Sequence, residues 1–230
     1  ARQLGPTLTA LSACSPWLAG RTGGHASTRE LAWGQLGDRP RSTPDPVGEW
    51  TRYALAAPVM FVDLPDGAMP VQRRIPFADW LSGHAQLADR RPTRADLSTH
   101  LSTLFPPVRL RGYLELRYLD VSPSRWWPAV AAVTTVLLDH PIAADAAREA
   151  SEPAVGLWAE AARDGLRDRR LARAARRCME IAATHVPSEL ATAVEDLAEL
   201  VAGGRSPGDL LADRIAEIGP LAAFEELAHA

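Results

Sequence analysis

Two charged residues, Glu115 and Arg117, lie two positions apart in the apolar segment Tyr113–Asp120 (YLELRYLD). Successive side chains of a strand point to opposite faces, so the pattern predicts a buried strand with this acid and this base on one face. Carboxylate oxygens are ligands of Mg²⁺, and the guanidinium fork of arginine binds phosphate or carboxylate. The pair therefore indicates a site for a metal ion and a phosphate. Ion pairs with charges on neighbouring strands at a solvated face remain the alternative.

Short elements are predicted before this segment. They are a helix at Pro6–Ala13, a helix at Val47–Leu55, a strand at Val59–Leu64 that ends at the turn Pro65–Gly67, a helix at Pro76–Leu81, and a helix from a Thr93/Asp96 capping box to about Leu104. From residue 126 onward the pattern is almost entirely helical. We therefore expect two regions, a sheet-bearing part at residues 1–125 and a helical part at residues 126–230, packed together as one continuous domain.

The composition excludes several classes of protein. The net charge is −3 and the pI is near 6.1, so there is no global reason to expect binding of nucleic acid. The chain has no lysine, which rules out a Schiff base or a lysine nucleophile. Its two cysteines, Cys14 and Cys178, have no CxxC spacing, so neither a zinc ribbon nor a redox pair is indicated. No apolar segment reaches the length of a membrane span, and we expect a cytoplasmic protein.

One helix of the second region is strongly basic. Its apolar stripe has helical spacing, and its arginines lie largely on other faces: Arg169, Arg170, Arg173, Arg176 and Arg177. A basic helix can bind an acidic partner, but a solvated face is the simpler interpretation.

Four pieces of the sequence, in a fixed order, resemble one known family. They are SACSPWLAG at Ser12–Gly20 with STRELAW at Ser27–Trp33, then RYALAAPVMFV from Arg52, FADWLSG from Phe77, and HLSTLFPPVRLRGYLELRYLD from His100. On these motifs the chain resembles the carboxy-terminal portion of glutamate–cysteine ligases of the bacterial and plant-type branch. It is most similar to the actinobacterial ligases of ergothioneine biosynthesis. The resemblance is clearest over residues 5–140.

The resemblance implies an α+β fold in which an antiparallel sheet is cupped around the active site and backed by helices. It implies an ATP- and Mg²⁺-dependent enzyme that joins the γ-carboxylate of L-glutamate to the amine of L-cysteine through γ-glutamyl phosphate. By the same resemblance, Glu115 is a Mg²⁺ ligand. Arg117 is the catalytic and nucleotide-binding residue that contacts the transferred phosphate, and Arg29 holds a substrate carboxylate. These roles suit phosphoryl transfer, which depends mainly on positioning and charge neutralisation.

The sequence also departs from the family pattern. The loop usually written Ala-Asn-Ser-Pro reads Ala13-Cys14-Ser15-Pro16, and Cys14 is interpreted as a small buried residue because the reaction needs no protein thiol. Family members are longer, so we expect a missing amino-terminal half that supplies further acidic metal ligands and part of the nucleotide site. Two alternatives stay open: a carboxylate–amine ligase with a different amine acceptor, and a non-catalytic helical binding or regulatory subunit.

Overall fold

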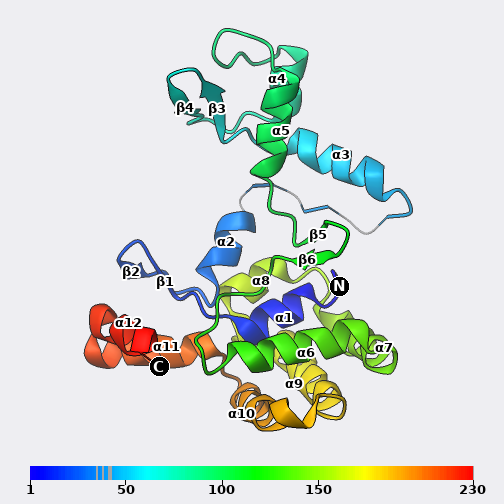
Figure 1. Cartoon of the computed structure of the whole chain (residues 1–230), viewed down its shortest axis with the longest axis vertical. Helices are drawn as coiled ribbons and strands as arrows, with labels where there is room; N and C mark the ends of the chain where they lie inside the picture. The colour runs from blue at the N-terminus through cyan, green and yellow to red at the C-terminus, as the bar shows by residue number, and fades with distance from the viewer. Residues whose placement is uncertain (35, 38, 41–42, 230) are drawn as a thin grey trace. The chain divides into compact units, whose positions relative to one another are not determined.

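The computed structural model describes residues 1–34, 36–37, 39–40 and 43–229 of the chain. Figure 1 shows the path of the chain and the elements along it. The first half contains α1 (Gly5–Ser12), β1 (Trp17–Leu18), β2 (Arg21–Thr22), α2 (Thr28–Gly34), α3 (Pro46–Ala56), β3 (Phe61–Leu64), β4 (Gly67–Pro70), α4 (Phe77–Ser82), α5 (Arg94–Ser102), β5 (Val108–Leu110) and β6 (Leu114–Leu116). The second half contains α6 (Trp127–Asp139), α7 (Pro141–Ala150), η1 (Glu152–Ala154), α8 (Trp158–Arg163), η2 (Gly165–Arg167), α9 (Arg169–Ala183), η3 (Ser188–Leu190), α10 (Ala191–Ala202), α11 (Pro207–Ile218) and α12 (Pro220–His229).

The fold is α+β, as predicted, but its strands form three separate antiparallel hairpins. β1 pairs with β2, β3 with β4, and β5 with β6. Across the described residues there is no larger sheet, so the expected cupped sheet is not assembled by this part of the chain. Each strand has only two to four residues, and each hairpin ends at a tight turn. Such short pairs depend on packing or on further strands for their stability.

The predicted strand Tyr113–Asp120 is shorter than expected and lies nearer the surface. Strand pairing covers Leu114–Leu116, and no described residue forms a partner strand for the chain beyond Leu116. Tyr113 and Leu114 are exposed, whereas Tyr118 and Asp120 are buried. The apolar residue types of this segment suggested that all of it is buried. At the hairpin, however, the sheet has only two strands, and some of its apolar side chains face solvent.

The chain divides into two compact units, each described here by itself. One consists of residues 1–32 and 108–230, and the other of residues 33–107. This division differs from the predicted boundary near residue 125. The reason is that α1, at the start of the chain, packs against α8 and α9 of the helical region (Figure 1).

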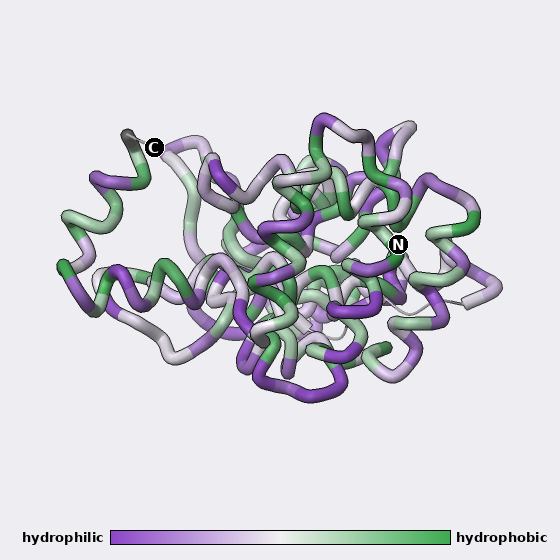
Figure 2. The backbone as a smooth tube through the Cα atoms, turned by 90° about the horizontal axis from the view of Figure 1, so that it is seen from below, coloured by the Kyte–Doolittle hydropathy of each residue, from purple (hydrophilic) through white to green (hydrophobic). Residues whose placement is uncertain are grey.

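The larger unit has a mainly helical core. Leu8 and Leu11 of α1 are wholly buried together with Leu137 of α6 and Leu171 of α9. Hydrophobic and hydrophilic stretches alternate along much of the backbone (Figure 2), as in amphipathic elements that cover a core. The predicted apolar stripe of α9 is confirmed, and its arginines are exposed.

The smaller unit has its own core under the β3–β4 hairpin. Val62, Phe77 and Trp80 are almost completely buried there. His100 of α5 is also buried, stacked on Phe77 at a ring distance of 4.7 Å, and its Nε2 lies 2.8 Å from the carbonyl oxygen of Ala54. His100 is therefore a packing residue.

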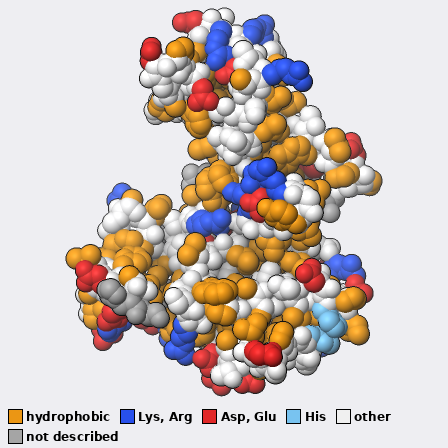
Figure 3. Space-filling model, in the orientation of Figure 1, with side chains coloured by type: hydrophobic (Ala, Val, Ile, Leu, Met, Phe, Trp, Pro, Cys, Tyr) orange, Lys and Arg blue, Asp and Glu red, His pale blue; other side chains and the backbone are white. Residues whose placement is uncertain are grey.

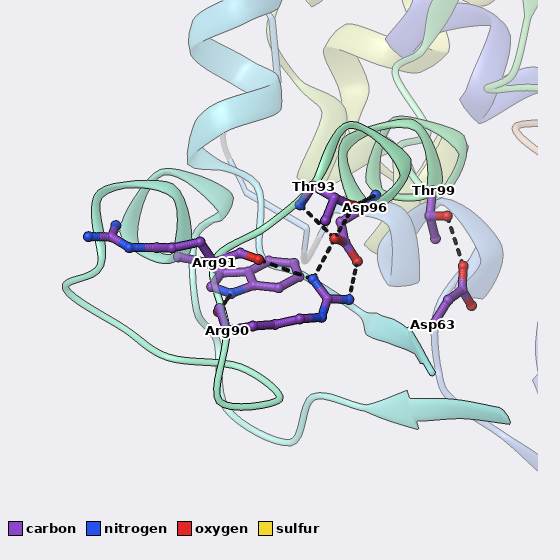
Figure 4. Close-up of polar contacts among 7 residues, drawn as sticks. Asp63, Arg90, Arg91, Thr93, Asp96 and Thr99 are labelled. Atoms are coloured by element: carbon purple, nitrogen blue, oxygen red, sulfur yellow. Dashed lines mark hydrogen bonds and ion pairs between the residues drawn. The ribbon is translucent and has the colours of Figure 1, made fainter. Parts of the chain in front are cut away.

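A polar network fixes the start of α5 (Figure 4). The Asp96 carboxylate accepts hydrogen bonds from the backbone N–H and hydroxyl of Thr93, which confirms the predicted capping box. Arg90 donates two more at 2.6 and 2.9 Å. At the exposed side of the helix, the Thr99 hydroxyl donates to Asp63 of β3 at 2.8 Å.

Among the described residues, no single helix has the length and hydropathy of a membrane span. Only α6 and α7 taken together pass that test, and a bend of 98° separates them.

Candidate functional site

The β5–β6 hairpin sets Arg109 directly opposite Glu115. The two residues are register partners, and the chain reverses at Gly112, which adopts a φ of +80°. A positive φ of this size favours glycine because a Cβ would strain the backbone. The predicted side-chain alternation holds locally, since Glu115 and Arg117 do project to the same side and contact one another.

Three arginines surround the carboxylate of Glu115. Arg109 donates from Nε to Oε2 at 2.7 Å and from Nη2 to Oε1 at 3.0 Å, a fork-on-fork pair. Arg117 donates from Nη1 to Oε1, and the Nε of Arg111 lies 3.9 Å from Oε2. Figure 3 shows arginine side chains (blue) beside an acidic side chain (red) in the part of the molecule where Figure 1 places this hairpin.

The surroundings of Glu115 keep it ionised. The hydrogen bonds from Arg109 hold the pKa of its carboxyl below the ordinary value, and the charges of Arg117 and Arg109 act in the same direction. The side chains of Glu115 and Arg117 are 26% and 15% exposed, so the cluster is partly shielded but open to a ligand. Three guanidinium groups around one carboxylate leave an excess of positive charge, which suits an anion such as phosphate.

Arg29 lies beside this cluster. Its Nη1 donates to the carbonyl oxygens of Arg117 at 2.9 Å and Leu119 at 3.1 Å. These two bonds use one nitrogen of the guanidinium, which has donors on its other nitrogens for a carboxylate. The three residues singled out in the sequence thus come together in one region of the structure.

A second polar cluster follows β6 and was not expected from the sequence. The buried carboxylate of Asp120 accepts a hydrogen bond from the backbone N–H of Cys14 and from the hydroxyls of Ser15 and Ser27. Asp120 ends the YLELRYLD segment, and its hydrogen bonds connect this segment to both the SACSPWLAG motif and the STRELAW motif. The sequence did contain a signal for this cluster, an aspartate at the end of an apolar segment. A carboxylate that is buried there needs several hydrogen-bond donors from elsewhere in the chain.

Sequence reasoning also missed two members of the arginine cluster, Arg109 and Arg111. The signal was Gly112: a hairpin that reverses there places Arg109 across from Glu115, as the cross-strand rule requires. Cys14 is buried, as interpreted from the sequence. Burial, and then the nearby charge of Asp120, raises the pKa of its thiol to about 12.

The residues in this region do not by themselves fit a Mg²⁺ ion. Both oxygens of Glu115 already accept hydrogen bonds from arginines. No group of three or more acidic, histidine or cysteine side chains with metal-site spacing occurs in the described part of the chain. Mg²⁺ requires oxygen ligands in octahedral geometry, and a single carboxylate between guanidinium groups does not supply them. The role of Glu115 as a metal ligand stays a prediction.

Comparison with known proteins relates the whole chain to one family. Glutamate–cysteine ligase family 2 (GCS2) matches residues 1–226. The glutamate–cysteine ligase EgtA of Mycolicibacterium smegmatis is 50% identical over 235 residues, which cover 99% of this chain and 55% of that protein. The protein of the same name from Mycobacterium tuberculosis is 47% identical over 238 residues, covering 100% of this chain and 55% of its own length.

More distant relatives match a smaller part. The chloroplastic glutamate–cysteine ligase of Solanum lycopersicum is 34% identical over 130 residues, or 53% of this chain and 25% of that protein. The chain spans about half the length of the two mycobacterial relatives.

Proposed function

The chain belongs to glutamate–cysteine ligase family 2, and from this premise we propose that it forms part of a ligase that joins the γ-carboxylate of L-glutamate to the amine of L-cysteine. The reaction is driven by ATP and gives γ-glutamylcysteine, in the cytoplasm, for the synthesis of ergothioneine. The observation that carries the proposal is the meeting of Glu115, Arg117 and Arg29 in a chain half of whose residues are identical to those of one such ligase.

The proposed reaction has two steps. The γ-carboxylate of glutamate attacks the γ-phosphorus of ATP, which releases ADP and leaves γ-glutamyl phosphate. The cysteine amine then attacks the acyl carbon, an N–C bond forms, phosphate leaves and the amine loses a proton. Negative charge gathers on the transferred phosphoryl oxygens in the first step and on the leaving phosphate in the second.

The arginine cluster suits both steps. Arg117 is the least exposed of its arginines, and we assign it to the transferred phosphate. Glu115 binds the guanidinium of Arg117, and Arg109 on the neighbouring strand binds Glu115 in turn, so little reorganisation is needed when charge develops. Arg29 is assigned to a carboxylate of glutamate, since backbone carbonyls of the described residues bind its guanidinium at Nη1 and the other nitrogens also carry donors. The acidic ligands that Mg²⁺ needs would belong to the part of such a ligase that this chain does not cover.

A chimaera tests this function. This chain replaces the matching half of the M. smegmatis ligase, and formation of γ-glutamylcysteine and ADP is measured with L-glutamate and ATP. Cysteine is compared with other amines as the acceptor. We expect activity that requires glutamate, ATP and cysteine together. A folded chimaera that forms no γ-glutamyl product with any amine would refute the proposal, and a preference for another amine would replace cysteine as the acceptor.

A further inference from the structure

The strongest unassigned feature of the larger unit is the carboxylate of Asp120. It is buried, and it accepts hydrogen bonds from Cys14 N and Ser15 Oγ at 2.8 Å on Oδ2 and from Ser27 Oγ at 2.9 Å on Oδ1. The donors come from positions more than 90 residues earlier in the chain. A buried carboxylate with three donors is a fixed point to which other segments are tied.

The two serines connect Asp120 to the backbone at the start of α2. Each hydroxyl gives its single proton to Asp120 and keeps its lone pairs free to accept. Ser15 Oγ accepts from the backbone N–H of Arg29, and Ser27 Oγ accepts from that of Glu30, both at 3.2 Å. Both serines therefore donate to Asp120 on one side and accept a backbone N–H on the other, which links the Asp120 carboxylate to the backbone of Arg29 and Glu30.

The side chain of Arg29 returns to the segment that carries Asp120. Its Nη1 donates to the carbonyl oxygens of Arg117 and Leu119, and Leu119 immediately precedes Asp120. A closed loop of contacts results: the carboxylate holds Ser15, Ser15 holds the backbone of Arg29, and the guanidinium holds the backbone beside the carboxylate. The position of Arg29 is therefore fixed at both its backbone and its side chain.

We propose that Asp120 is a positioning residue that fixes the guanidinium of Arg29 for the carboxylate of glutamate. The identity of that ligand rests on the proposed function, whereas the positioning itself rests on the geometry of this chain. The three-donor arrangement keeps Arg29 in place before any ligand arrives.

The first experiment uses this chain alone. Asp120→Asn and Ser15→Ala interrupt the contacts. Ser12→Ala is the matched control, because it also removes a buried serine hydroxyl, one that donates within α1 to the Leu8 carbonyl at 2.7 Å. Nitrogen NMR of the arginine side chains is recorded at low temperature, and melting is measured for each variant.

A held guanidinium gives separate, slowly exchanging Nη signals. We expect these for Arg29 in the parent chain and in Ser12→Ala, and averaged signals in Asp120→Asn and Ser15→Ala. Unchanged Arg29 signals in both site variants would overturn the proposal, as would equal averaging in Ser12→Ala. Should Asp120→Asn fail to fold, Ser15→Ala decides the question.

The second experiment places the same variants in the chimaera with the M. smegmatis ligase. We expect the KM for glutamate to rise about tenfold to a hundredfold in Asp120→Asn, the range for loss of a hydrogen-bonded charged contact. The KM for ATP and kcat should change by less than about twofold, because Arg29 binds the ground state and transition state alike. An equal fall in kcat for every variant with no change in the KM for glutamate would contradict positioning. An inactive parent chimaera would instead refute the proposed function and leave the NMR result to stand.

Discussion

At the scale of single residues, the cluster around Glu115 is held together by hydrogen bonds between charged groups. One carboxylate receives forked hydrogen bonds from Arg109 and a further bond from Arg117. Arg111 reaches the same group only at 3.9 Å and is half exposed. The arginines therefore differ in how firmly they are held, and we expect the replacement of Arg117 to have a larger effect than the replacement of Arg111.

Arg117→Lys should lower kcat in the chimaera by about a hundredfold, while Arg111→Lys should change it by less than about threefold. A lysine keeps the charge but loses the planar fork that holds a phosphate in the transition state. Steady-state kinetics with saturating substrates measure the two variants side by side. Equal effects at both positions would argue that only net charge matters in this cluster.

The thiol of Cys14 should be chemically inert in the folded chain. Because its pKa is raised to about 12, mainly by burial, its thiolate fraction at pH 8 is on the order of a thousandfold below that of a free cysteine. Mass spectrometry after iodoacetamide treatment should find Cys14 and Cys178 unmodified in the native chain and both modified in urea. Rapid native labelling of Cys14 would contradict the burial.

At the scale of elements, local sequence and distant contacts jointly fix the smaller unit. The capping box of Thr93 and Asp96 starts α5, and Arg90, stacked on Trp80 at 5.5 Å, ties that helix end to the core. His100 then anchors the other end of α5 under α3. These two anchors respond differently to mutation and to pH.

Thr93→Ala should destabilise the smaller unit by about 1 kcal/mol, the usual effect of losing an N-cap. Thr99→Ala is the control, because its hydroxyl also binds an aspartate but away from the helix start, and its effect should stay below about 0.5 kcal/mol. Urea unfolding gives both values. A larger effect at Thr99 would mean that its bond to β3 stabilises this helix more than the cap does.

Acid should destabilise the smaller unit through His100. Burial lowers the pKa of its ring, so below pH 6.5 the unfolded chain binds a proton that the folded chain does not. Stability is therefore lost as the pH falls from 6.5 towards the folded pKa, by up to about 1.4 kcal/mol per pH unit. His100→Gln should flatten this part of the pH profile, and His84→Gln, at an exposed position, should leave it unchanged.

At the scale of the whole molecule, charge is unevenly distributed. Residues 163–177 hold seven arginines and two aspartates, although the chain as a whole has a net charge of −3. Arg169, Arg173, Arg176 and Arg177 are exposed along α9, where Arg173 has an arginine four residues away on each side. Like charges at this spacing repel one another.

Replacing Arg173 by glutamate should therefore stabilise the chain by about 1 kcal/mol, which raises Tm by roughly 2–4 °C for a chain of this size. Arg176→Glu is the matched control, since the new glutamate would be repelled by Glu180 four residues on but attracted by Arg173 three residues back. Thermal melts at low salt should therefore give a clearly smaller shift for Arg176→Glu than for Arg173→Glu. Both shifts should shrink in 1 M NaCl because salt screens exposed charges.

The sequence by itself determined the features that depend on neighbours along the chain. The apolar stripe of α9, the capping box at Thr93, the strand that ends at Leu64 and the shared face of Glu115 and Arg117 all follow from periodicity, turn and cap chemistry, and side-chain alternation. The motif order also indicated the family that residues 1–226 match.

Only the tertiary structure decided the contacts between distant segments. The apolar residues of α1 pack into the core of the helical region. For this reason the start of the chain belongs to the same compact unit as residues 108–230, and the two units are not divided near residue 125. Asp120 gathers Cys14, Ser15 and Ser27 from about a hundred residues earlier, because a buried carboxylate needs donors wherever the fold supplies them. Periodicity along the sequence does not predict such contacts, since they depend on how distant segments pack in three dimensions.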